Sequence, residues 1–121
     1  MPFTQLNNAE AIPSWVTTLG AAAAILSSPV VPTNTRVELS GIIVANVTAA
    51  AHTFSLYLHR STDVAAVGNA VCFNVAIAAN TMYIIDGPII MQAGWQLSGN
   101  ADAGASVNVT VNGYIINEAA Q

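Results

Sequence analysis

The residues of this chain that could carry chemistry are few and lie far apart. The candidates for a nucleophile and its base are Cys72, His52 and His59. A thiol nucleophile needs a histidine and a third, orienting group beside it, whereas Cys72 lies in the middle of an expected strand, where a free cysteine usually packs as a small apolar residue. His52 and His59 are seven positions apart, and an odd separation within a strand places them on opposite faces. We therefore predict no catalytic residue and no enzymatic activity.

The remaining chemically active groups are carboxylates, and these are dispersed. Asp63, Asp86 and Asp102 lie in expected turns, where an aspartate commonly bonds its own backbone. The histidines, the cysteine and the carboxylates offer no ligand pair at a recognised metal-binding spacing. His59 and Asp63 could meet across a loop, and a surface histidine beside a turn aspartate is the simpler interpretation. We predict no metal site and no cofactor.

Very few residues of the chain are charged. Its 121 residues include two basic and six acidic side chains, or 7%, where a globular protein carries about 25%. The net charge of −4 with so few basic groups argues against a phosphate-binding surface, so nucleic acid is not an expected partner. A freely diffusing monomer normally has a charged surface of mixed sign. The composition therefore indicates a building block whose surface is covered by other copies or by a scaffold.

Membrane association is not expected either. The longest apolar run is residues 19–26, and a membrane-spanning helix needs about 20 apolar residues. The first residues lack the basic start of a secretory signal. We predict no membrane segment.

From residue 20 onward, apolar and polar residues alternate in short runs separated by turn signals. A period of two is typical of half-buried strands. The runs are 21–28, 35–47, 52–60, 70–77, 81–85, 89–91, 95–99 and 105–117. About eight short strands in one chain predict an all-β fold, an antiparallel two-sheet β-sandwich that is jelly-roll-like.

Two of these runs predict which side chains face the core. In run 35–47, one face holds Val37, Leu39, Ile43 and Val47. In run 70–77, one face holds Val71, Phe73, Val75 and Ile77. Gly41 marks a bulge in the first run, and Asp86-Gly87-Pro88 is expected to break the strand that starts at residue 81.

Residues 1–19 differ from the rest because they show no sustained period. We expect an extended N-terminal arm over 1–19 and a β-sandwich domain over 20–121. The arm carries two large aromatics, Phe3 and Trp15, which a solvated tail seldom does. It is either a frayed terminus or an arm that docks on a neighbouring subunit. Phe3, Trp15 and Trp95 are the candidate interface anchors, because aromatic residues dominate interface energetics.

The polar positions of the expected strands are amides and hydroxyls in place of charges. They are Asn46, Thr53, Ser55, Asn74, Asn108, Thr110 and Asn112. Solvent-facing strands normally use Lys and Glu, which also protect edge strands from pairing with other chains. Their absence indicates either that many of these faces meet protein or that the surface is merely low in charge.

The stretch from Val37 to Ile116 resembles a small β-sandwich module of the structural proteins of tailed bacteriophages. The resemblance rests on the order of five phrases, residues 35–46, 53–58, 75–81, 87–94 and 107–113. It covers about two-thirds of the chain, and it implies a virion structural protein with no catalytic residues to carry over. Members of this group sit on the head surface, the neck or the tail, so the module does not fix the location. No long fibre or receptor-binding head follows the sandwich here.

The first hypothesis is a capsid decoration or cement protein, a homotrimer that stabilises the shell by contacts with itself and with the major capsid protein or other virion proteins. Its location would be the virion, assembled in the host cytoplasm. A neck or tail adaptor or a fibre base is the second hypothesis. A carbohydrate-binding β-sandwich, using Tyr57, Trp95 or Tyr114, is the third.

Overall fold

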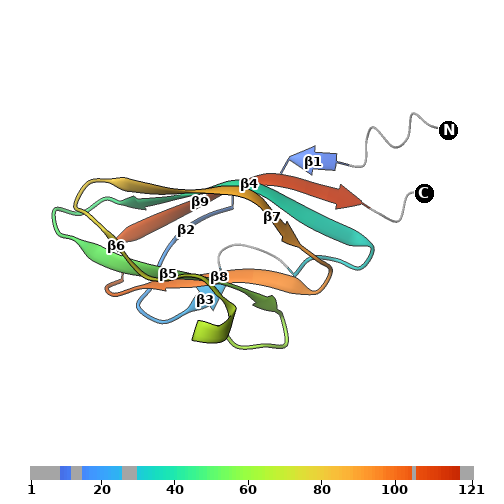
Figure 1. Ribbon diagram of the computed structural model, residues 1–121, viewed down its shortest axis with the longest axis horizontal. Coiled ribbons are helices and arrows are strands. Elements are labelled where there is room, and N and C mark those ends of the chain that lie inside the picture. The colour runs from blue at the N-terminus through green and yellow to red at the C-terminus, as the bar shows by residue number, and fades with distance from the viewer. Residues whose placement is uncertain (1–8, 12–14, 26–29, 105, 118–121) are drawn as a thin grey trace.

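The computed structural model describes residues 9–11, 15–25, 30–104 and 106–117, and shows two antiparallel sheets packed face to face (Figure 1). The predicted all-β, two-sheet sandwich is therefore confirmed. Its strands are β1 (Ala9–Ala11), β2 (Trp15–Thr18), β3 (Ala24–Ile25), β4 (Thr35–Asn46), β5 (His52–Arg60), β6 (Ala70–Ile77), β7 (Met82–Met91), β8 (Trp95–Ala101) and β9 (Val107–Asn117). A single turn of 3-10 helix, η2 (Val67–Asn69), lies between β5 and β6.

The chain passes repeatedly between the two sheets. Sheet A has the order β1-β9-β4-β7, with β2 also paired to β9, and sheet B has the order β3-β8-β5-β6. From β6 onward, successive strands fall in alternate sheets, as in a jelly roll. This topology leaves β6 and β7 as the last strands of their sheets on one side of the sandwich.

The core lies between the sheets and draws on both of them. Its largest fully buried side chains are Phe54, Leu19, Leu39, Ile42, Leu56, Met91 and Leu97. Each such side chain contributes about 1.5–3 kcal/mol by leaving water. A chain without intrachain disulfides can therefore be held together by this core alone.

The described part of residues 1–19 is built into the sandwich. Strands β1 and β2 both pair with β9, and Trp15 lies opposite Val111. Trp15 is only 5% exposed and Leu19 only 1%, because the inward face of sheet A needs bulk at its β2 side to cover the core. Trp15 is thus a core residue of this chain and not an exposed anchor. The rest of the predicted arm, residues 1–8 with Phe3 and residues 12–14, lies outside the described residues.

Strand β7 runs through Asp86-Gly87-Pro88, where we expected a break. Leu39 pairs with Ile89 and Gly41 with Asp86, so two residues of β7 lie opposite one of β4. Pro88 is tolerated because β7 is an edge strand, where a missing N–H need not cost a ladder hydrogen bond. The irregularity is a β-bulge within a continuous strand.

Strand β4 also bulges at this point, as the position of Gly41 predicted. Its register against β9 shifts between Leu39 and Gly41 as well. Before the bulge Leu39 is buried, and beyond it Ile42 and Val44 are buried. The prediction that Ile43 and Val47 face the core is therefore wrong, because one extra residue reverses which face each later side chain occupies.

Two glycines allow the neighbouring strands to approach the bulge. A Cβ on Gly113 of β9 would press against the carbonyl oxygen of Glu38 and lie 2.8 Å from the Cα of Leu39. A Cβ on Gly87 of β7 would press against the carbonyl oxygen of Leu39. Any side chain at either position would push the strands apart at the bulge.

A second irregularity reverses the faces of β6. Asn74 adopts a positive φ of 50°, and the pairing of β5 with β6 shifts register around Leu56. Val75 and Ile77 pack inward as expected, but Val71 and Phe73 are exposed, and Cys72 packs against the core instead. The predicted inward position of Val71 and Phe73 is wrong because the extra residue at Asn74 changes the parity.

Candidate functional site: the outer surfaces of the two sheets

The three predicted anchors fall in different environments. Trp15 is in the core, and Phe3 is outside the described residues. Trp95 begins β8, is half-buried and packs against the core. None of the described anchors is therefore a fully exposed aromatic.

The outer face of sheet A presents exposed apolar residues in cross-strand rows. One row runs from Ile84 on β7 through Ile43 and Thr110 to Val16 on β2. Ile84 is 57% exposed and Val16 54%. The adjacent row runs from Met82, which is 64% exposed, through Ala45 and Asn108 to Thr18. We call these two rows the sheet A patch.

The sheet A patch carries no charge among its described side chains. The charged residues of β4 and β7 lie at or beyond the bulge, namely Arg36, Glu38 and Asp86. Exposed apolar side chains gathered on an uncharged part of a protein surface commonly mark an interaction site. The patch is therefore the part of sheet A best suited to meet another protein.

The pattern that produces the patch was present in the sequence. Two adjacent apolar residues in a strand point to opposite faces, so Ile42-Ile43 and Ile84-Ile85 each require one isoleucine outside the core. Strand pairing alone decides which isoleucine of each pair points outward, since the bulge sets which face each later residue occupies. These adjacent isoleucines are the sequence signal for the patch, whereas the predicted anchors were all aromatic residues.

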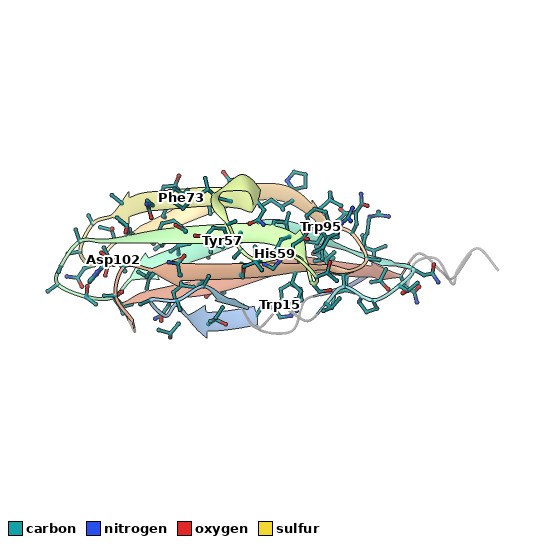
Figure 2. All side chains as sticks on the ribbon, turned by 90° about the horizontal axis from the view of Figure 1, so that it is seen from below. Trp15, Tyr57, His59, Phe73, Trp95 and Asp102 are labelled. Atoms are coloured by element: carbon teal, nitrogen blue, oxygen red, sulfur yellow. The ribbon has the colours of Figure 1, made fainter. Side chains whose placement is uncertain are left out.

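The β6–β7 side of the sandwich is also apolar. Within the described chain, β7 pairs with β4 and β6 pairs with β5, so each is an edge strand. Between them they carry a single charged residue, Asp86. Val71 and Phe73 are exposed on β6, and Tyr83 is 40% exposed on β7. Figure 2 shows Phe73 along one long side of the molecule and Trp15 toward the other.

Tyr83 of the edge strand β7 packs across the sandwich against Phe54 of β5, in the other sheet. Its ring meets Phe54 edge-on, with centroids 5.6 Å apart and planes at 65°. Such pairs contribute about 0.5–1.5 kcal/mol beyond their buried area. The β6–β7 side is thus an apolar surface, and its two edge strands lack the lysines that usually discourage pairing with other strands.

A hollow of about 310 Å³ lies at the bulge end of sheet A and is lined in part by Glu38, Pro88 and Tyr114. Tyr114 is 52% exposed. Arg36 and Glu38 form an ion pair, with Nη2 and Oε2 2.8 Å apart. Of the three aromatics considered for carbohydrate binding, Tyr57 is buried and Trp95 half-buried. Tyr114 is therefore the exposed one.

On β5 and β8 the outer face of sheet B is polar, and several of its groups bond to one another. The Tyr57 hydroxyl donates to Asn100 Oδ1 at 3.1 Å. The Asn74 backbone N–H donates to Ser55 Oγ at 2.9 Å. Ser55 is 2% and Tyr57 7% exposed. The expectation that these polar positions meet another protein does not hold for Ser55, because its side chain is buried and its partner lies within the chain.

His59 and Ser98 form the deepest hydrogen bond of this face. His59 Nδ1 lies 2.7 Å from the Arg60 carbonyl oxygen, and Nε2 lies 2.8 Å from Ser98 Oγ. A carbonyl can only accept, so Nδ1 carries a proton, and in the neutral imidazole Nε2 then accepts from the serine hydroxyl. Both side chains are at least 95% buried, beside a hollow of about 270 Å³ that Asp63 also lines. The histidine is a buried structural partner and not the surface residue we expected.

The other polar groups act locally. His52 Nδ1 lies 2.8 Å from Asp102 Oδ1, which links the start of β5 to the turn after β8. The buried amide of Asn46 donates to the carbonyl oxygens of Ala50, Ile77 and Ala78. Asn46 therefore organises the loop that follows β4.

Reactive and metal-binding groups are sparse in the described ranges. There, no three His, Cys, Asp or Glu side chains are grouped closely enough to hold a metal ion. Burial raises the pKa of the Cys72 thiol, which disfavours the nucleophilic thiolate. None of the described segments forms a helix long and apolar enough to span a bilayer.

Comparison with known proteins finds similarity of fold but not of sequence. No protein-family model and no curated protein matches this chain. A protein from Bacillus endospore appendages, described as disulfide-linked pili, aligns with a TM-score of 0.54 and 8% identity over 90% of this chain and 86% of its own. A protein of infectious bursal disease virus, strain Gx, aligns with a TM-score of 0.57 and 14% identity over 93% of this chain, which spans about a third (33%) of that protein.

A third similar structure is the core of Drosophila NLP, described in terms of pentamer formation and histone binding. It aligns with a TM-score of 0.50 and 11% identity over 88% of this chain and 99% of its own. At these identities the similarity establishes the β-sandwich fold alone.

Proposed function

We propose that this chain is a virion structural protein of a tailed bacteriophage, specifically a capsid decoration or cement protein that acts as a homotrimer. The observation that carries the proposal is the sheet A patch, where Met82, Ile84 and Val16 are each more than half exposed and none of the described side chains is charged. A monomer gains nothing from exposing these side chains, whereas an assembly buries them.

The fold is compatible with this function. Proteins of similar fold include one from a virus and one from a pilus, and both descriptions concern assemblies of many subunits. The resemblance of the sequence to structural modules of tailed bacteriophages is the reason for proposing this type of virus. Partners would be other copies of the chain and the major capsid protein or another virion protein, with neither nucleic acid nor membrane involved. The location would be the virion, assembled in the host cytoplasm.

Stabilisation of a shell would come from buried area. A protein interface of ordinary size buries about 1,600 Å², and a subunit that contacts both its own copies and the shell forms several of these. Residues 1–8 precede β1 at the end of β9, since Ala9 pairs with Ile116. That position would let Phe3 reach a neighbouring subunit.

Mass spectrometry of virions from the phage that encodes the chain tests the proposal. Hundreds of copies per particle support a decoration protein on the head. Tens of copies support the neck or tail adaptor, and absence from purified virions overturns the virion assignment altogether.

Deletion of residues 1–8 tests the arm separately. Deletion of residues 1–19 would also remove Trp15 and Leu19 from the core and would confuse unfolding with loss of docking. The shorter deletion is expected to leave a folded sandwich that no longer loads onto particles. Unchanged occupancy on particles would show that the arm is dispensable.

One observation favours a second function, carbohydrate binding. Tyr114 is exposed beside Glu38 in the hollow at the bulge, and a few polar groups beside an apolar platform are typical of small-ligand sites. Calorimetric titration with neutral oligosaccharides would give saturable binding that Tyr114→Ala abolishes and Val47→Ala, an exposed residue elsewhere, preserves. No heat of binding with any oligosaccharide would exclude this function.

A further inference from the structure

Two apolar surfaces of this sandwich meet at β7. The sheet A patch includes Ile84 on the outer face of that strand. The β6–β7 side includes Tyr83, the preceding residue, and Phe73 is exposed on the other edge strand, β6. Successive residues of a strand point to opposite faces, so β7 contributes exposed apolar side chains both to the outer face of sheet A and to the side of the sandwich.

The outer face of sheet A is large enough for a stable contact. Strand β4 has 12 residues, which span about 40 Å, and four strands about 4.8 Å apart are about 19 Å wide. The whole face, of which the sheet A patch is the uncharged part, therefore offers roughly 750 Å², against about 800 Å² per partner in an ordinary protein interface.

Charge favours another copy of this chain as the partner. The chain has a net charge of −4, so copies repel one another wherever their acidic groups approach. The sheet A patch and the β6–β7 side have a single charged residue between them, Asp86. These two surfaces are the places where copies can meet with the smallest repulsion.

The position of the two surfaces decides the kind of contact. In a two-fold, face-to-face pair the sheet A patches of two copies would cover each other, but Val71, Phe73 and Tyr83 would stay exposed. A contact between the β6–β7 side of one copy and the sheet A patch of the next covers both surfaces on every copy. Such a head-to-tail contact produces a closed ring when the rotation closes.

We infer that the sheet A patch and the β6–β7 side are the two complementary halves of one contact between copies of this chain. The copies then form a closed ring, with the open edge of each sandwich lying on the outer face of sheet A of its neighbour. The inference deepens the proposed function and rests on it for the number of copies, three. The contact itself stands on the exposure, charge and placement of these residues.

Light scattering on the full-length purified protein tests the contact with variants on the two surfaces. Val16→Asp places a charge on the sheet A patch at β2, and Phe73→Asp places one on β6 at the other side of the molecule. Each variant is expected to reduce the mass from three chains to one. Val64→Asp is the matched control, since Val64 is 81% exposed but lines the hollow over sheet B. It should retain the mass of three chains.

A mixture of the two variants distinguishes the head-to-tail contact from a face-to-face one. Val16→Asp keeps an intact β6–β7 side, and Phe73→Asp keeps an intact sheet A patch. Mixed in equal amounts, they can form one intact contact, so a species of two chains should appear that neither variant forms alone. Circular dichroism confirms folding, and Phe73→Ser serves as the milder variant if Phe73→Asp is unfolded.

Several results would overturn the inference. They are a monomeric wild-type protein, an unchanged mass for either variant, and a mixture that stays monomeric. In particular, loss of assembly in Val16→Asp with none in Phe73→Asp would identify a face-to-face pair. Failure of the proposed function would be detected by the mass spectrometry of virions. If the protein is absent from purified virions but its wild-type ring is disrupted by these variants, the contact stands and the virion assignment is removed.

Discussion

The two sheets use their outer faces in opposite ways. On strands β5 and β8 of sheet B, outward residues such as Tyr57, His59 and Ser98 are polar yet buried, and they form the hydrogen bonds Tyr57–Asn100 and His59–Ser98. On sheet A they include apolar residues that remain exposed, such as Ile84 and Met82. The polar face has its partners within the chain, whereas the apolar face gains them only from another molecule. Exposure of apolar groups is therefore the better guide to the proposed interaction surface, because the shortage of charge is common to both faces.

The largest expected effect comes from Trp15, whose neighbour Val16 belongs to the sheet A patch. Trp15→Ala removes a 5%-exposed core side chain and should lower the free energy of unfolding by about 3–5 kcal/mol. Val16→Ala should change it by less than about 0.5 kcal/mol. Urea denaturation below the concentration of assembly measures both. Similar losses for the two variants would mean that β2 does not present one residue inward and the next outward.

Asn46 and Asn108 compare a buried amide with one on the outer face of sheet A. Asn46→Ala leaves the carbonyl oxygens of Ile77 and Ala78 without their amide donor, at an expected cost of about 2–3 kcal/mol. Asn108 makes a hydrogen bond with Thr18 at an exposed site, and Asn108→Ala should cost about 0.5 kcal/mol or less. Thermal unfolding of both variants makes the comparison. A small loss of stability in Asn46→Ala would show that the loop after β4 forms without the Asn46 amide.

Ser98 tests the polar network of sheet B directly. Ser98→Ala removes the hydroxyl that donates to His59 Nε2 and should destabilise the fold by about 1–2 kcal/mol, because the acceptor is left buried. Thr110→Ala, on the outer face of sheet A, is the control and should change stability by less than about 0.5 kcal/mol. Guanidinium unfolding gives both values. If both variants lower the free energy of unfolding by the same small amount, the His59–Ser98 hydrogen bond does not stabilise this face of sheet B.

The smallest effect concerns Cys72 and Phe73, which lie on opposite faces of β6. Burial raises the pKa of the Cys72 thiol above its ordinary value of 9.0. The thiol therefore ionises more readily in the unfolded chain, so its contribution to stability is present below pH 9 and is lost as the pH rises through the folded-state pKa. Stability should thus fall slightly more steeply above pH 9 than in Cys72→Ala.

Thiol labelling at pH 8 sharpens the same comparison. Cys72 should react slowly with a disulfide reagent, whereas Phe73→Cys in a Cys72→Ala background should react at the rate of an exposed thiol. Equal rates would contradict the reversal of faces at Asn74.

Local pattern was enough to predict the strands themselves. The bounds expected for β5 and β6, 52–60 and 70–77, agree with the structure, since alternation of apolar and polar residues is continuous there. The interaction surface was not predictable in the same way. Ile43, Val71 and Phe73 were assigned to the core because each continues an alternation that a bulge interrupts. Gly41 predicts the bulge from the sequence, but the faces of the later residues of β4 depend on how the bulge pairs with β7 and β9.

The sequence by itself determined that this protein is an all-β sandwich with a low-charge surface, because alternation and composition are local properties of the chain. Only the tertiary structure decided which apolar residues stay outside. A bulge is set by the pairing of strands distant in sequence, here β4 with β7 and β9, and it moves every later side chain to the other face. Likewise, only the packing of β2 against β9 made Trp15 a core residue, while the apolar corner at β7 was left uncovered.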